Sequence, residues 1–79
     1  MTNLEQYNQA FREMLNVTDD MLHGLSYQGI KEWDSIGHME LISAIEEAFD
    51  IEMETDDIVD FSGYEKGMEI LSEKYGIQF

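Results

Sequence analysis

Hydrophobic residues recur at spacings of three and four near the start of the chain. This spacing places them on one face of an α-helix, so we expect a first amphipathic helix over residues 3–16. Asn3 is the candidate cap of its amino end. The apolar positions of this stripe are Leu4, Tyr7, Phe11, Met14 and Leu15.

Two further stretches show the same period, and they predict helices in the middle and at the end of the chain. The middle helix begins at Ser35 and carries the stripe Leu41, Ile42, Ile45 and Phe49. The last helix carries the stripe Tyr64, Met68, Leu71 and Tyr75. Its candidate cap is Ser62, and Gly76 is a candidate stop.

The periodicity fails over residues 16–34, where two glycines and scattered apolar residues predict a long ordered loop with a short turn after Thr18. The residues expected to pin this loop are Val17, Leu22, Leu25, Ile30 and Trp33. A brief helix over Asp56–Asp60 is expected before the last one. No stretch alternates as a strand does, so residues 1–79 predict one all-α domain. We expect a small four-helix bundle of three main helices plus a short third helix, with a long loop between helices one and two.

Composition narrows the possible partners. Eighteen acidic residues against four Lys and Arg give a net charge of −14, which disfavours nucleic acid and anionic membranes. The chain is 43% hydrophobic and lacks cysteine, so it can form a core but has no disulfide or thiol nucleophile. No apolar run is long enough to span a bilayer, and two histidines without cysteine predict no metal site. We expect a cytoplasmic monomer without membrane insertion.

Asp34 and Ser35 stand directly before the middle helix and have three possible roles. Either side chain can cap the helix, which is the commonest role of such a pair. A hydrolase triad with His38 is a poor alternative, because an Asp adjacent to the Ser cannot orient the far side of the imidazole. Finally, the Ser35 hydroxyl can serve as an attachment point, since a helix amino end favours a phosphate.

The segment DSIGHMELISAIEEAFDIEM, which begins at Asp34, resembles the phosphopantetheine-attachment segment of acyl carrier proteins. That family's pattern is Asp-Ser-Leu followed by a helix with Glu-Leu, an aliphatic pair and Glu-Glu-x-Phe. Ile36 replaces the usual Leu here, and the family's Gly two residues before the pair is Glu32. The positions that match in order and spacing are Asp34, Ser35, Glu40, Leu41, Ile45, Glu46, Glu47 and Phe49. The long first loop also fits the family plan, so the resemblance covers nearly the whole chain.

The resemblance implies a free-standing carrier that is not itself an enzyme. A phosphopantetheinyl transferase would attach 4'-phosphopantetheine from coenzyme A to Ser35, and Asp34 would help to hold the transferase's metal ion. The arm would then carry acyl or aminoacyl groups as thioesters between biosynthetic enzymes. The sequence indicates neither the cargo nor the pathway, which fatty acid, polyketide or nonribosomal peptide synthesis would each fit.

Twelve Asp and Glu residues and no Lys or Arg lie between Lys31 and Lys66. Such a run is commonly only a solvated surface, but this one begins beside Ser35. We expect it to steer acyl-loading and acyl-consuming enzymes with basic surfaces. The residues predicted to recognise these partners are Ile36, Met39, Glu40, Glu47, Asp56 and Asp57. The alternative function is an acidic helical adaptor that binds a basic partner without a cofactor, with Ser35 only a cap.

Overall fold

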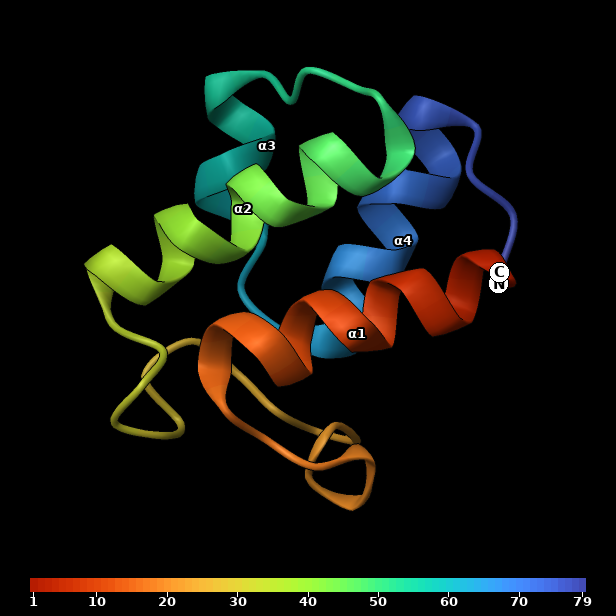
Figure 1. Cartoon of the computed structure of the whole chain (residues 1–79). Helices are drawn as coiled ribbons and strands as arrows, with labels where there is room; N and C mark the ends of the chain where they lie inside the picture. Colours follow the sequence, from red (N-terminus) through yellow and green to blue (C-terminus); the bar gives the residue numbers. More distant parts are fainter.

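The computed structural model describes all residues from 1 to 79. Its four α-helices are α1 (Asn3–Leu15), α2 (Ser35–Phe49), α3 (Thr55–Asp60) and α4 (Tyr64–Tyr75). A short 3-10 turn, Asp19–Met21, lies in the long first loop. The molecule contains no strand, only a single bridge between Ser26 and Gly63. The predicted all-α fold is therefore confirmed, with three longer helices and a short third one (Figure 1).

Helix α1 begins through a capping box formed by Thr2 and Glu5. The Thr2 hydroxyl accepts a hydrogen bond from the Glu5 amide at 3.1 Å, and the Glu5 carboxylate reaches back to the Thr2 amide. The prediction of Asn3 as the cap is wrong, because its side chain donates instead to the Gln78 carbonyl, 2.9 Å away. This bond helps to hold the two ends of the chain side by side, as Figure 1 shows.

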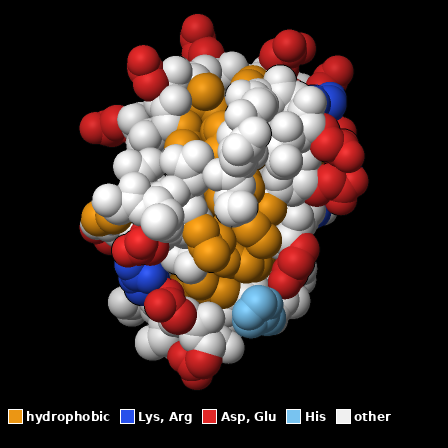
Figure 2. Space-filling view, turned by 90° about the vertical axis from the view of Figure 1, so that its right-hand side faces the viewer, with side chains coloured by type: hydrophobic (Ala, Val, Ile, Leu, Met, Phe, Trp, Pro, Cys, Tyr) orange, Lys and Arg blue, Asp and Glu red, His pale blue; other side chains and the backbone are white.

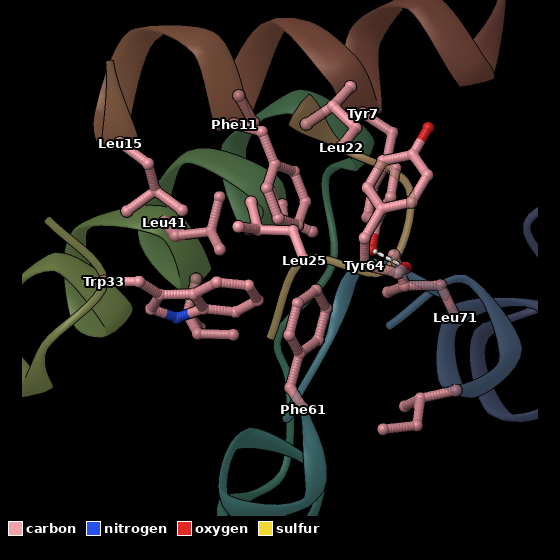
Figure 3. Packing of buried hydrophobic residues seen from close by; sticks show 14 of the residues in the cluster. Tyr7, Phe11, Leu15, Leu22, Leu25, Trp33, Leu41, Phe61, Tyr64 and Leu71 are labelled. Carbon is pink, nitrogen blue, oxygen red and sulfur yellow. Dashed lines mark hydrogen bonds between the residues drawn. The ribbon is translucent and has the colours of Figure 1, made fainter. Parts of the chain in front are cut away.

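The core is one cluster of 17 buried residues with aromatic rings at its centre. Phe11 of α1 meets Trp33 of the loop edge to face at 5.5 Å, and its ring also lies beside that of Phe61, with 6.4 Å between the centroids (Figure 3). Gly67 of α4 makes room for these rings. A Cβ there would lie 2.3 Å from the Phe61 ring and 2.4 Å from the Tyr7 hydroxyl. The aromatic side chains therefore fix how closely α4 approaches α1.

The long loop between α1 and α2 is pinned as the sequence predicts. Its apolar residues Val17, Leu22, Leu25 and Trp33 are buried and Ile30 is half-buried. Two backbone bonds, from the Tyr27 amide to the Ser62 carbonyl and from the Tyr64 amide to the Leu25 carbonyl, tie the loop to the start of α4. Ser62 is consequently not the cap of α4. Gly63 occupies that position without a side-chain bond.

Candidate functional site

The Asp34 carboxylate caps the amino end of α2. Its Oδ1 accepts the Gly37 amide at 2.8 Å, while its backbone carbonyl accepts the His38 amide at 2.8 Å. Ser35 is therefore the first residue of the helix, not its cap. Its side chain is exposed and its hydroxyl makes no hydrogen bond within the protein. Asp34 therefore provides the hydrogen-bond acceptor for an amide at the helix end, and the Ser35 hydroxyl is left accessible.

Gly37 allows the loop to lie directly against the first turn of α2. A Cβ on this residue would lie 2.1 Å from the carbonyl oxygen of Glu32, a backbone atom that cannot move aside alone. The loop segment itself is closed by a bond from the Gln28 amide to the Trp33 carbonyl at 2.9 Å. Close backbone packing therefore sets the position of Asp34 and Ser35.

His38 joins three parts of the molecule next to this helix end. The Trp33 indole donates to His38 Nδ1 at 2.9 Å, and His38 Nε2 lies 2.8 Å from the Ile58 carbonyl in α3. Since an indole nitrogen can only donate, Nδ1 is the acceptor and Nε2 carries the proton that is donated to Ile58. Neither ring nitrogen is bonded to Ser35, and Asp34 is engaged with Gly37. The structure therefore contains no Ser-His-Asp triad at this position.

Two apolar hollows flank the Ser35–Met39 edge of α2. The first, which we term the α2 hollow, encloses about 590 Å³ toward α1. The second, the α3 groove, is a more enclosed space of about 330 Å³ toward α3. The α2 hollow is lined by Met14, Ser35, Ile36, Met39, Glu40, Ser43, Ala44 and Glu47. The α3 groove is lined by Tyr27, Ser35, His38, Met39, Ile58, Val59, Phe61 and Ser62.

Four of the six residues predicted to recognise partners line the α2 hollow, which Ser35 also lines. Ile36 is 70% exposed and Met39 51% exposed, which is unusual for large apolar side chains on an otherwise amphipathic helix. Glu40 and Glu47 are exposed and line the α2 hollow with them. Asp56, at the start of α3, is also exposed. These five residues define what we term the recognition surface.

Asp57 does not belong to this surface, and the structure corrects the prediction that it contacts a partner. Its side chain is only 4% exposed, and its two oxygens bind Lys74 Nζ at 2.6 Å and the Tyr75 hydroxyl at 2.7 Å. The hydrogen bond from Lys74 lowers the pKa of Asp57 most, and the hydrogen bond from Tyr75 lowers it further. Asp57 therefore fastens α3 to α4.

Val59 is a surface residue that the sequence reasoning missed. It is 73% exposed and lines the α3 groove, next to Ile58, which is half-buried. The signal was present in the sequence, because two adjacent apolar residues in a single-turn helix cannot both face the core. Ile36, Met39 and Val59 are therefore exposed apolar side chains that line the two hollows beside Ser35.

Acidic side chains dominate the surface elsewhere as well. Figure 2 shows the face that carries the chain termini, where many acidic groups and few basic ones border a central apolar stripe. No group of three or more His, Cys, Asp or Glu side chains is arranged to hold a metal ion. None of the helices combines the length and the apolar character needed to cross a bilayer.

Comparisons of the chain with protein-family models, with curated proteins and with solved structures found no match.

Proposed function

We propose that the protein is an acyl carrier whose Ser35 bears a 4'-phosphopantetheine arm. The observation that carries the proposal is the accessible Ser35 hydroxyl at the first residue of α2, with the capping task taken over by Asp34. It is supported by the resemblance of residues 34–53 to the attachment segment of carrier proteins.

The surroundings of Ser35 fit such a modification. A phosphate on its Oγ would lie at the amino end of a 15-residue helix, where unpaired amides and the helix dipole favour negative charge. The flexible arm beyond the phosphate would meet one of two apolar hollows, both of which Ser35 lines. When bound, the arm supplies the thiol that forms thioesters, which this cysteine-free chain cannot supply itself.

The chain's own contribution to the modification is to present one nucleophilic oxygen. Ser35 Oγ would form a new P–O bond with the phosphate that carries pantetheine, and the pyrophosphate bond of coenzyme A would break. Adenosine 3',5'-bisphosphate would leave, and the Ser35 proton would pass to a base of the transferase. By family resemblance, Asp34 would help to hold the transferase's metal ion.

The recognition surface would bring the carrier to its enzymes. Its exposed acids Glu40, Glu47 and Asp56 would steer basic partners at long range, while Ile36 and Met39 would make the short-range apolar contact. Such encounters are fast and weak, as a carrier that must release each partner requires.

Mass spectrometry tests the proposal directly. Apo protein incubated with coenzyme A, Mg²⁺ and a broad-specificity phosphopantetheinyl transferase should gain the mass of one phosphopantetheine. Ser35→Ala should gain nothing, whereas Ser43→Ala, which removes an exposed hydroxyl two turns along the same helix, should be modified normally. Absence of a mass gain in the unaltered chain would favour the alternative of a cofactor-free acidic adaptor.

A further inference from the structure

The α3 groove has a chemical character that distinguishes between the two kinds of cargo, acyl and aminoacyl, that the proposed function leaves open. No Lys, Arg, Asp or Glu lines it. Its polar side chains are the hydroxyls of Tyr27, Ser35 and Ser62 and the imidazole of His38. A charged group that entered the groove would therefore lose its hydration without gaining an ionic partner.

The His38 imidazole does not provide that partner, because both of its nitrogens are already used. Nδ1 accepts from Trp33 at 2.9 Å, and Nε2 donates to the Ile58 carbonyl at 2.8 Å. The ring is packed among aromatic neighbours, with Tyr27 at 5.3 Å and Phe61 at 6.1 Å between ring centroids. His38 thus presents carbon atoms rather than a free nitrogen to the groove.

The bond to Ile58 also holds the far wall of the groove in place. Helix α3 ends at Asp60, so the Ile58 carbonyl has no amide of a following turn to accept. His38 satisfies this carbonyl and thereby fastens the carboxyl end of α3 to α2. Without the bond, the wall formed by Ile58 and Val59 would be released from the helix that carries Ser35.

We infer that His38 is a positioning and specificity-determining residue that keeps the α3 groove narrow and free of charge. The groove then accepts a short, uncharged acyl chain carried on the arm of Ser35 and leaves an ammonium-bearing aminoacyl group in solvent. The acidic field of the surface attracts an ammonium group, but exposed ionic interactions are weak and screened, and they act outside the groove. At about 330 Å³, the groove lies at the lower end of the range for small-molecule sites, which favours short cargo.

The inference rests on the proposed function for its biological meaning, but its test does not require the transferase. The chain has no cysteine, so a Ser35→Cys variant carries a single thiol. This thiol reacts with hexyl methanethiosulfonate or with its 6-aminohexyl analogue to form a disulfide, and methanesulfinate is released. The two products differ only in a terminal ammonium group.

The hexyl product should shift the amide resonances of Tyr27, His38 and Val59 and raise Tm by about 5 °C, the effect of burying one or two methylenes in so small a domain. The aminohexyl product should do neither. A matched Ser43→Cys variant, whose thiol would face only the α2 hollow, should leave the amide resonances of Tyr27, His38 and Val59 unshifted with either reagent. Equal effects of the two reagents, or shifts confined to the α2 hollow, would overturn the inference.

Two substitutions test the role of His38. The amide of His38→Gln reaches the place of Nε2 and can still donate to Ile58, whereas His38→Asn replaces only Nδ1 and is too short for that bond. In His38→Asn, the Phe61 amide at the end of α3 should exchange about fivefold faster, as expected for one lost hydrogen bond, and the hexyl effect on Tm should vanish. His38→Gln should keep both the slow exchange of the Phe61 amide and the hexyl effect on Tm.

A merely structural histidine would lower Tm in both variants without changing the discrimination between hexyl and aminohexyl. That result would refute the role of His38.

A failure of this test leaves the transferase assay unaffected, and the converse also holds. Modification of Ser35 without discrimination between the two reagents would mean a carrier with an unselective groove. Discrimination without modification would mean an apolar site on a protein that carries no arm.

Discussion

The carboxylate of Asp57 in α3 lies 2.6 Å from the ammonium group of Lys74 in α4. The Tyr75 hydroxyl donates to the other Asp57 oxygen and accepts the Glu54 amide at 2.9 Å, so the same cluster also supports the start of α3. Helix α3 has only six residues, too few for a stable isolated helix. Its place in the fold therefore depends on this cluster at one end and on His38 at the other.

Replacing Asp57 with asparagine should lower Tm, because Lys74 then loses its ionic partner while the shape of the side chain is kept. Asp56→Asn, which alters an exposed neighbour, should leave Tm unchanged or raise it by relieving repulsion. Thermal unfolding followed by circular dichroism gives both values. A lower Tm in both variants would indicate that the helix start, not the Lys74 pair, needs the acids.

The contribution of this cluster should also depend on pH in a defined way. The pKa of Asp57 is lowered from its ordinary 3.8, so its stabilisation is present above that value and is lost as the pH falls through the lowered one. The pKa values of Lys74 and Tyr75 are raised from 10.5 and 10.0, so their share is lost as the pH rises through the raised values. The difference in Tm between the unaltered chain and Asp57→Asn should be constant from about pH 5 to 9 and shrink outside that range. A steady change across the neutral range would contradict this assignment.

Substitutions at Asp34 and Ser35 should separate stability from modification. Asp34→Ala removes the oxygen that accepts the Gly37 amide and should cost about 1 kcal/mol of unfolding free energy. Ser35→Ala removes a hydroxyl without an internal partner and should change that free energy by less than about 0.5 kcal/mol. Urea denaturation measures both. A larger loss for Ser35→Ala would show that this residue is needed by the fold.

Gly37→Ala should destabilise the protein by about 1–3 kcal/mol, because the new methyl group overlaps the Glu32 carbonyl. This loss should exceed the roughly 1 kcal/mol that alanine gains over glycine in a helix. Because relief of the overlap moves the helix end, transferase modification of Ser35 should also slow. Ser43→Ala, an exposed substitution on the same helix, controls for helix propensity. An unchanged or higher stability of Gly37→Ala would mean that the loop can withdraw freely.

Salt should stabilise the protein, because the net charge of −14 means that acidic side chains repel one another in the folded state and dissolved ions screen this repulsion. Thermal melts should show Tm rising between low and high NaCl concentration. Mg²⁺ and Ca²⁺ should act equally at matched concentration, because no cluster of acids is arranged to hold one ion. A strong preference for Ca²⁺ would reveal a built site that the structure does not show.

Neutralising Glu40 and Glu47 together with glutamine should slow association with a transferase on the order of tenfold at low salt. The dissociation rate should change little, because these side chains are exposed. Stopped-flow measurements at two salt concentrations separate the two rates. The matched variant neutralises Glu69 and Glu73 on exposed positions of α4, and its association should be nearly normal. Equal slowing in both variants would mean that net charge alone, not the recognition surface, governs the encounter.

The helices were predictable because each longer one needs an apolar stripe toward the core, and that stripe has a fixed period. The predicted start of α2 at Ser35 and the stop of α4 at Gly76, whose φ is 69°, are both confirmed. The caps were less predictable. Thr2 and Glu5 form a capping box that the sequence does contain. Gly63, by contrast, is bridged to the distant Ser26, through the Tyr27–Ser62 and Tyr64–Leu25 backbone bonds, and no local side chain caps α4.

The roles of Asp57 and His38 were beyond prediction from sequence. Each depends on a partner 17 to 20 residues away. The packing of α3 against α2 and α4 brings these partners together. An acid in an acidic run gives no sign that it alone faces a lysine. The exposure of Ile36 and Met39, by contrast, could be anticipated, because both lie at the margin of the apolar stripe of α2.

Trp33 is the chain's single tryptophan, fully buried and hydrogen-bonded to His38 one turn from Ser35. Its intrinsic fluorescence therefore comes from one place in the molecule and needs no dye. Loading of the arm, filling of the groove or breakage of the indole bond would each alter the emission of this one chromophore. The protein thus contains an optical reporter beside the proposed attachment site.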